Sequence, residues 1–331
     1  MEKNEIRFAT VGTSGITEQF LEEAANNSEF RLRAVYSRDR ERAERFARQQ
    51  GADVYYDDLD AMAEDPEIDA VYIASPNALH CAQTMKFIAA GKHVLCEKPL
   101  CSNLSEARRM FEAAEQSNVI LMEAMRSLHD PGFGVLREEI KKIGKIRRAS
   151  FRYCQYSSRY DAFKAGKRQN IFDPGCSAGA LMDIGVYCVE PLAALFGEPK
   201  SLQAVSVMLD GGIDGAGTVL ADYGDMTAEL IYSKITESHL PSEVQGEAGV
   251  LLIDEIACPE KIEIRYNDGR TKRFDTGPGG NNMRYELQGF TDAVSGRKHI
   301  EEYRRISMLS IKLMDRVREI CGIRFPADES V

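Results

Sequence analysis

The 331-residue sequence has no tryptophan, no CxxC pair and no run of eighteen or more apolar residues. The missing apolar run excludes a membrane-spanning helix of ordinary length. The eight cysteines are scattered, which predicts free thiols in a reducing compartment and no metal site. Excess positive charge is also absent: the formal net charge is -10, so a nucleic-acid-binding surface is not expected. The polar start, Met1–Glu5, has no signal-peptide pattern, and the cytoplasm is the expected location.

The composition is typical of a globular protein, with 44% hydrophobic and 28% charged residues, and the length suits two domains. Over residues 1–124, short β-rich runs such as Ile6–Val11 alternate with helical patterns such as Asp39–Gln50. This rhythm predicts a doubly wound parallel sheet, which is a Rossmann domain. Over residues 125–331, longer alternating strands separated by turns predict an α+β domain with an open, mostly antiparallel sheet. The open sheet is a candidate surface for a homo-oligomer, either a dimer or a tetramer.

A glycine-containing loop follows the first expected strand. Its residues are Gly12, Thr13, Ser14, Gly15, Ile16 and Thr17. Glycines at such a turn let the backbone approach a pyrophosphate, and the following helix supplies N–H groups and positive dipole. The full GxGxxG pattern is missing, since Ser14 and Thr17 replace two glycines. A tight strand-to-helix turn without a ligand is therefore an alternative explanation.

The end of the second expected strand carries hydroxyl and guanidinium groups where an NAD enzyme usually has an acidic residue. Ser37 and Arg38 lie at this point, and Arg42 follows one helical turn later. These groups suit the 2′-phosphate of NADP, so NADP is expected and NAD is the alternative cofactor. A solvated helix start capped by Asp39 would give the same pattern without any ligand.

The fourth expected strand ends in a loop at the predicted cofactor crevice, since the carboxyl ends of parallel strands face it. The candidate cofactor-binding residues there are Ala74, Ser75, Pro76, Asn77 and His80. Pro76 and Asn77 also suit a turn and a helix start, and His80 on a helix suits a structural role.

The fifth expected strand, His93–Cys96, lies in the segment Gly91–Leu100 and is followed by Glu97-Lys98-Pro99. With the loops at Gly12 and Ser75, this tripeptide resembles the glucose-fructose oxidoreductase and inositol dehydrogenase (Gfo/Idh/MocA) family over nearly the whole chain. The resemblance implies an NAD(P)-dependent oxidoreductase acting on a sugar, polyol or dihydrodiol. It places Lys98 near the reacting carbon and Glu97 and Lys98 beside the cofactor. A loop ion pair is the structural alternative for these two residues.

The segment Gly179–Tyr187 carries Asp183 and Tyr187, which share one face if the segment is helical. Many family members have histidine where this chain has Tyr187, and the tyrosine is similar to the dimeric dihydrodiol dehydrogenase branch. We therefore expect Tyr187 to be the acid–base group, assisted by Lys98, because a lysine cation stabilises a phenolate. Asp183 would bind substrate or orient Lys98. A half-buried packing role is the alternative for a helical tyrosine.

Three further residues are expected near the cofactor: Arg126, Arg168 and Tyr285. Each also suits packing or surface exposure. The loops 156–170 and 211–217 are expected to select the substrate. A non-catalytic NADP-binding regulator is the competing function, since one fold serves many functions. The presence of both Lys98 and Tyr187 favours the enzyme.

Overall fold

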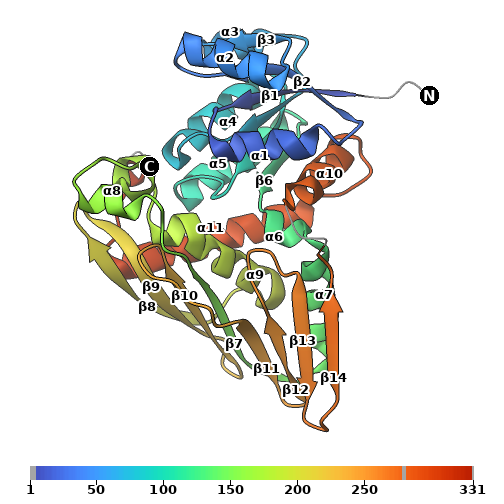
Figure 1. The fold of residues 1–331 in the computed structure, drawn as a ribbon, viewed down its shortest axis with the longest axis vertical. Helices are drawn as coiled ribbons and strands as arrows, with labels where there is room; N and C mark the ends of the chain where they lie inside the picture. Colours follow the sequence, from blue (N-terminus) through green and yellow to red (C-terminus); the bar gives the residue numbers. More distant parts are fainter. Residues whose placement is uncertain (1–4, 278–280, 330–331) are drawn as a thin grey trace. The chain divides into compact units, whose positions relative to one another are not determined.

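The computed structural model describes residues 5–277 and 281–329, and the chain forms two compact units (Figure 1). The N-terminal unit consists of Met1–Met125 and Asn281–Arg305, and the C-terminal unit of Arg126–Gly280 and Ile306–Val331. The first change of unit falls between Met125 and Arg126. The segment 281–305 groups with the N-terminal unit, although it lies within the expected second domain, residues 125–331.

The N-terminal unit is built on a parallel sheet with strand order β3-β2-β1-β4-β5-β6. Its strands are β1 (Ile6–Val11), β2 (Phe30–Tyr36), β3 (Val54–Tyr56), β4 (Ala70–Ile73), β5 (His93–Glu97) and β6 (Leu121–Ala124). The strand order reverses between β1 and β4, and open α/β sheets bind ligands at such a switch point. The predicted doubly wound sheet is confirmed.

Helices with apolar stripes cover this sheet. They are α1 (Gly15–Ala24), α2 (Arg40–Gln50), α3 (Leu59–Glu64), α4 (His80–Ala89), α5 (Leu104–Gln116) and α10 (Met283–Val294), with a 3-10 turn at Asn77–Leu79. On α2, Ala43, Phe46 and Ala47 are buried, as expected from their spacing. Asp39 caps this helix, since its side chain accepts a hydrogen bond from the Arg42 backbone N–H.

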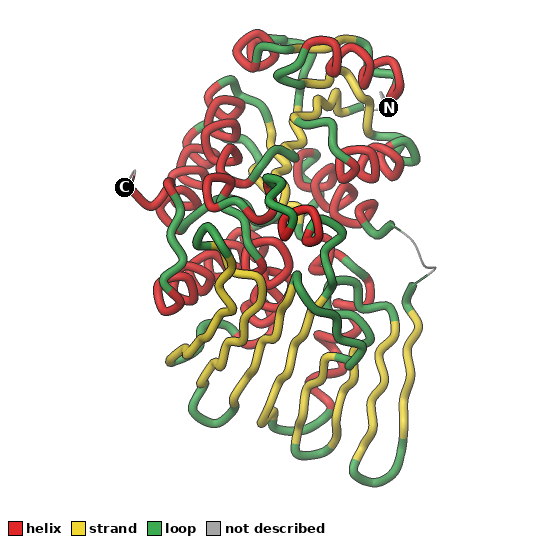
Figure 2. The backbone as a smooth tube through the Cα atoms, turned by 60° about the vertical axis from the view of Figure 1, so that its left-hand side comes forward, coloured by secondary structure: helices red, strands yellow, loops and turns green. Residues whose placement is uncertain are grey.

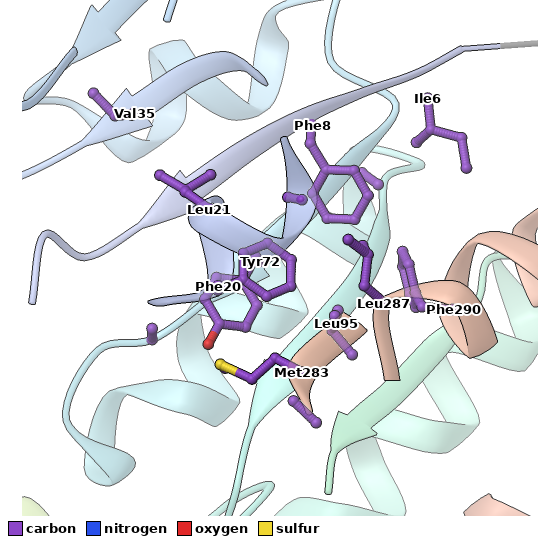
Figure 3. Close-up of a cluster of buried hydrophobic side chains, with 14 of the residues drawn as sticks. Ile6, Phe8, Phe20, Leu21, Val35, Tyr72, Leu95, Met283, Leu287 and Phe290 are labelled. Carbon is purple, nitrogen blue, oxygen red and sulfur yellow. The ribbon is translucent and has the colours of Figure 1, made fainter. Parts of the chain in front are cut away.

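The core of the N-terminal unit includes side chains from the distant segment α10 (Figure 3). Met283, Leu287 and Phe290 are buried with residues of β1, α1 and β4. The Phe290 ring meets the Phe8 ring edge-on, with centroids 5.6 Å apart. Helix α10 therefore completes the Rossmann unit rather than the domain that precedes it in the sequence.

The C-terminal unit contains a mixed sheet with strand order β14-β13-β12-β11-β7-β10-β9-β8. Only β7 and β10 pair in parallel among these neighbours, which confirms the mostly antiparallel prediction. The strands are β7 (Ile146–Cys154), β8 (Ser201–Leu209), β9 (Ile213–Asp222), β10 (Thr227–Ser233), β11 (Ser242–Gly246), β12 (Gly249–Ile253), β13 (Lys261–Tyr266) and β14 (Thr271–Asp275). The last of these was not expected from the sequence.

One face of the C-terminal sheet packs against helices of the same unit (Figure 2). The helices of this unit are α6 (Arg126–His129), α7 (Pro131–Glu139), α8 (Tyr160–Lys164), α9 (Val186–Phe196) and most of α11 (Glu301–Cys321), and short helical turns lie at 140–142, 170–172, 174–176 and 326–329. Helix α7 contacts β13, and α9 contacts β7 and β10. The covered face carries buried side chains such as Phe151, Val219 and Leu230. Neighbouring residues on β8 and β9 point the other way, and Val205 and Leu220 are 71% and 51% exposed. The sheet is therefore open on one side.

The eight cysteines are free, as the sequence predicts. The segment Pro174–Phe196 is long and apolar enough to pass for a membrane span by composition. Most of it is buried inside the protein, however, with 78% of its most apolar window covered. It is thus a core segment of the C-terminal unit.

Candidate active site

The loop after β1 is shaped for close backbone approach. Gly12 has φ +114°, and a Cβ at this position would lie 2.7 Å from the Ala74 carbonyl oxygen at the end of β4. Any side chain would therefore clash with the neighbouring strand end. Ser14 and Gly15 are exposed, and Gly15 begins α1, so the first N–H groups of this helix lie at the switch point. The cradle fits a pyrophosphate despite the two missing glycines.

The end of β2 presents the polar groups that were expected to contact a ribose phosphate. Arg38 and Arg42 are exposed, and the Arg42 Nη2 atom donates to the Thr13 carbonyl at 3.0 Å. Ser37 Oγ accepts a hydrogen bond from the Asp39 backbone N–H at 3.3 Å. Arg42 thus joins α2 to the glycine loop, which brings a guanidinium beside the predicted cofactor cradle.

His80 is fully buried and connects two of the predicted cofactor loops. Its two ring nitrogens lie 2.8 Å from the Ser75 carbonyl and 3.0 Å from the Pro99 carbonyl. Burial lowers the pKa of His80, which favours the neutral ring. The Ser75 hydroxyl donates to Gln83 at 2.6 Å. His80, which the sequence predicts beside the cofactor, therefore supports the loop 74–77 through the Ser75 carbonyl.

The Glu97–Leu100 loop is fixed by buried hydrogen bonds. The Tyr72 hydroxyl donates to Glu97 Oε1 at 2.5 Å, and Tyr72 itself stacks on Phe20 with ring centroids 3.7 Å apart (Figure 3). Glu123, on β6, accepts from the Leu100 backbone N–H at 2.8 Å. Glu97 is buried, while Lys98 is half-buried. The hydrogen bonds of Glu97 and Leu100 thus fix the backbone on both sides of Lys98.

In the C-terminal unit, the segment with Asp183 and Tyr187 is not one continuous α-helix. Leu181–Gly185 forms a π-helical turn, and α9 continues from Val186. π-Helical turns often occur at functional sites. Pro191 lies inside α9, and because it has no N–H it cannot bond the carbonyl of Tyr187 four residues earlier.

Buried Asp214 on β9 holds the start of this segment. Its Oδ2 accepts from the Leu181 backbone N–H at 2.7 Å. A Cβ at Gly179, which has φ +111°, would lie 2.1 Å from Asp214 Oδ1. Burial raises the pKa of Asp214 to about 6. This glycine and this aspartate therefore set the entry of the chain into the π-helical turn.

Tyr187 is 7% exposed and lies between two side chains. The Arg126 guanidinium lies over its ring, with Cζ 5.6 Å from the centroid. The Tyr153 ring meets it edge-on at 5.5 Å. Arg126, expected beside the cofactor, therefore contacts the expected acid–base residue within its own unit.

Asp183 forms an ion pair with Lys234, which directly follows β10. The Lys234 side chain is 6% exposed, and its Nζ lies 5.9 Å from the centroid of the Phe172 ring. Sequence reasoning missed Lys234 because 51 residues separate it from Asp183. A lysine directly after a strand whose last two side chains, Tyr232 and Ser233, are buried was the available signal.

The two remaining expected residues have local partners. Arg168 is exposed and pairs with Asp173 at 2.6 Å. It lines a cavity of about 790 Å³ formed by α8, the residues after it and the β8–β9 turn. Tyr285, on α10 of the N-terminal unit, accepts a hydrogen bond from Arg284 at 3.1 Å. Among the described residues there is no cluster of three or more potential metal ligands.

Comparison with known proteins identifies the family. The model of the oxidoreductase family with an NAD-binding Rossmann fold, GFO_IDH_MocA, matches residues 6–125, and a GFO/IDH/MocA C-terminal domain model matches residues 137–252. The chain belongs to this oxidoreductase family, so the predicted resemblance is confirmed.

Particular relatives cover nearly the full length. The chain is 46% identical over 327 residues to the scyllo-inositol 2-dehydrogenase (NADP(+)) IolU of Bacillus subtilis, covering 98% of this chain and 100% of IolU. It is 31% identical over 334 residues to trans-1,2-dihydrobenzene-1,2-diol dehydrogenase of Oryctolagus cuniculus, covering 93% and 95% of the two chains. Among solved structures, the 3-ketoreductase KijD10 of Actinomadura kijaniata, in complex with NADP and TDP-benzene, matches with a TM-score of 0.84 at 26% identity, covering 96% and 98%.

Proposed function

We propose that this protein is an NADP-dependent dehydrogenase or reductase acting on a CH–OH carbon of a sugar, polyol or dihydrodiol. The observation that carries the proposal is the rigid Glu97–Leu100 loop, which presents Lys98 after the fifth strand of a nucleotide-binding sheet. The relatives named above support the substrate class, since their names describe an inositol, a diol and a ketone.

NADP is the proposed cofactor. The cradle at Gly12 would hold its pyrophosphate, and Ser37, Arg38 and Arg42 would hold its 2′-phosphate. The names of IolU and of the KijD10 complex both include NADP. When bound, the nicotinamide supplies the hydride acceptor or donor.

The side chains of this protein then move the proton. During oxidation the Tyr187 hydroxyl group, in its phenolate form, takes the proton of the substrate hydroxyl; during reduction it returns one. Lys98 supplies a positive charge that favours the anionic oxygen. Asp183, held in place by Lys234, is available to accept a hydrogen bond from a second substrate hydroxyl.

A double-mutant cycle tests these roles. Turnover of scyllo-inositol, myo-inositol, glucose and a trans-dihydrodiol is first measured with NADP and with NAD. We then expect Tyr187→Phe and Lys98→Met each to lower kcat by roughly 10²- to 10⁴-fold while NADP still binds. The double variant should lose much less than the product of the two effects, because the residues serve one step.

Tyr223→Phe is the matched control, since its hydroxyl bonds the Gly197 carbonyl elsewhere in the C-terminal unit. Near-wild-type turnover in either active-site variant would disprove its assigned role. NADP binding without turnover of any substrate in the panel would instead favour a regulatory protein of the same fold.

The cavity at α8 is the proposed recognition site for substrate groups away from the reacting carbon. Tyr160, Phe163 and Phe172 line it with aromatic rings, and Phe172 also contacts Lys234, the partner of Asp183. Phe163→Ala should therefore raise KM and change kcat little. A loss in kcat with unchanged KM would contradict this role.

We further propose a homo-oligomer formed through the open sheet face. Val205, Val207 and Leu220 are exposed on β8 and β9, and strand pairing places them on the same side. Exposed apolar patches of this kind mark interaction sites. The open face of this eight-stranded sheet is a surface that a second copy of the chain can cover with two-fold symmetry.

A further inference from the structure

Arg126 is a charged side chain that contacts the Tyr187 ring inside the C-terminal unit. It is half-buried at the first position of α6, and its Cζ lies 5.6 Å from the ring centroid. The Tyr153 ring, on β7, contacts the same tyrosine edge-on at 85°. The ring of Tyr187 is therefore in contact with an aromatic edge and with a permanent cation.

A guanidinium over an aromatic ring is attracted to the π-electrons. The attraction is stronger for a phenolate than for a phenol, because the phenolate carries a full negative charge. Arginine keeps its own charge at every pH used in enzymology, whereas a lysine can lose its proton. A fixed cation at this position thus biases a tyrosine toward the form that accepts a proton.

Other charged groups lie around this pair. Asp183 lies on the π-helical turn four residues before Tyr187, and Lys234 pairs with it from the end of β10. Glu255, after β12, is close enough to Arg126 for their charges to interact: desolvation raises the pKa of Glu255 and Arg126 opposes that rise. Lys234 is thus the positive partner of Asp183, and Glu255 is a negative group near Arg126. Arg126 therefore lies among other charged groups and not in a neutral core.

We propose that Arg126 is a positioning residue for Tyr187: it holds the ring and stabilises the phenolate during the proton transfer step. This inference rests on the proposed function of Tyr187. It replaces the expectation from sequence that Arg126 binds the cofactor. It also gives Tyr187 an electrostatic partner from its own unit, in addition to the Lys98 assigned through the family.

The pH dependence of kcat tests the proposal, with scyllo-inositol and NADP as the probe substrates. Arg126→Met should shift the rise of oxidation rate toward higher pH by roughly 0.5 to 1 unit. On the acidic side of the profile the rate should therefore fall about three- to tenfold. Arg126→Lys should recover most of the shift, and the Kd for NADP should stay within about twofold of wild type.

Arg137→Met is the matched control, because Arg137 lies over the Phe133 ring at 5.9 Å on α7 of the same unit. It removes an arginine–aromatic contact that does not involve Tyr187, and its profile should overlay that of the wild type. Arg126→Gln serves as a second neutral variant, and circular dichroism confirms which variants are folded.

Two results would overturn the inference. One is an unmoved pH profile in folded Arg126→Met or Arg126→Gln. The other is a tenfold or greater loss of NADP affinity with an unmoved profile, which would return Arg126 to the cofactor site. Tyr187→Phe is measured alongside to distinguish a failure of this inference from a failure of the proposed function. If Tyr187→Phe retains turnover, the proposed role of Tyr187 is wrong. If Tyr187→Phe loses turnover but the pH profile of the Arg126 variants does not move, only the inference about Arg126 is wrong.

Discussion

Asp214 gives the sharpest stability prediction, because a carboxyl group is buried where it meets the start of the π-helical turn. It is fully buried, and its Oδ2 atom accepts the Leu181 backbone N–H at 2.7 Å. The test is Asp214→Asn, which keeps the shape and the acceptor oxygen but cannot ionise. The variant separates the hydrogen bond to the backbone from the cost of a buried charge.

The magnitude follows from the change in pKa on folding. An ordinary aspartate has a pKa of 3.8, and burial raises the pKa of folded Asp214 to about 6. The folded state holds this proton more tightly, so the stabilising contribution is complete below the unfolded value and is lost as the pH rises through the folded one. At roughly 1.4 kcal/mol per pH unit, the loss is about 3 kcal/mol. The unfolding free energy of Asp214→Asn, minus that of wild type, should rise by this amount between about pH 4 and pH 8.

Urea denaturation at a series of pH values, followed by far-UV circular dichroism, measures this difference. Tyrosine fluorescence is a second probe, since the chain has no tryptophan. Asp222→Asn is the control, because it removes an exposed carboxylate from the same strand, β9. A difference between Asp214→Asn and wild type that stays constant with pH would refute the reasoning, as would an equal trend in Asp222→Asn.

Three further predictions concern the cofactor, the Asp183 pair and the open sheet. Arg42→Ala should weaken NADP binding about tenfold in calorimetry and leave NAD binding within about twofold, because NAD has no 2′-phosphate for the guanidinium to bind, and water can replace the guanidinium at the Thr13 carbonyl; equal losses for both cofactors, or the same loss in the control Arg45→Ala on α2, would contradict it. Lys234→Met should lower kcat/KM at least about tenfold by leaving a carboxylate at the site without its buried cation; the control Lys272→Met breaks the pair between Lys272 on β14 and Glu139 on α7, and an equal loss there would count against a specific role. Val205→Glu should reduce the particle mass in light scattering, since it places charge in the proposed interface; an unchanged mass, or a fall in the control Gln49→Glu, would argue against that surface.

The fold could largely be predicted because its signals are local. Short buried strands, helix caps such as Asp39 and glycine turns each depend on residues close together in the sequence. The return of α10 to the Rossmann unit could not be predicted in this way. Its apolar stripe, with Leu287 and Phe290, shows that it is covered but not which sheet covers it.

The candidate site shows the same limit. The loop at Gly12 and the tripeptide ending at Pro99 are sequence motifs, and both lie at strand ends as expected. The contact of Arg126 with Tyr187 joins residues 61 positions apart, and the pairing of Lys234 with its aspartate depends on strand order. Such contacts follow from the three-dimensional arrangement, so no local pattern could have shown them. The roles of the predicted catalytic residues stay predictions until their variants are measured.

The return of α10 also affects how the protein is made. A ribosome releases the six strands of the Rossmann sheet long before it reaches Met283, Leu287 and Phe290, which belong to the core of that sheet. During this interval the apolar surface around Phe8 is incompletely covered. The entire second sheet must be synthesised in the meantime, so the nucleotide-binding unit reaches its final packing only after that sheet has been translated. Co-translational folding should therefore depend on protecting that surface. A chain truncated before residue 281 contains all six strands of the Rossmann sheet, but it should aggregate more readily than the full-length chain.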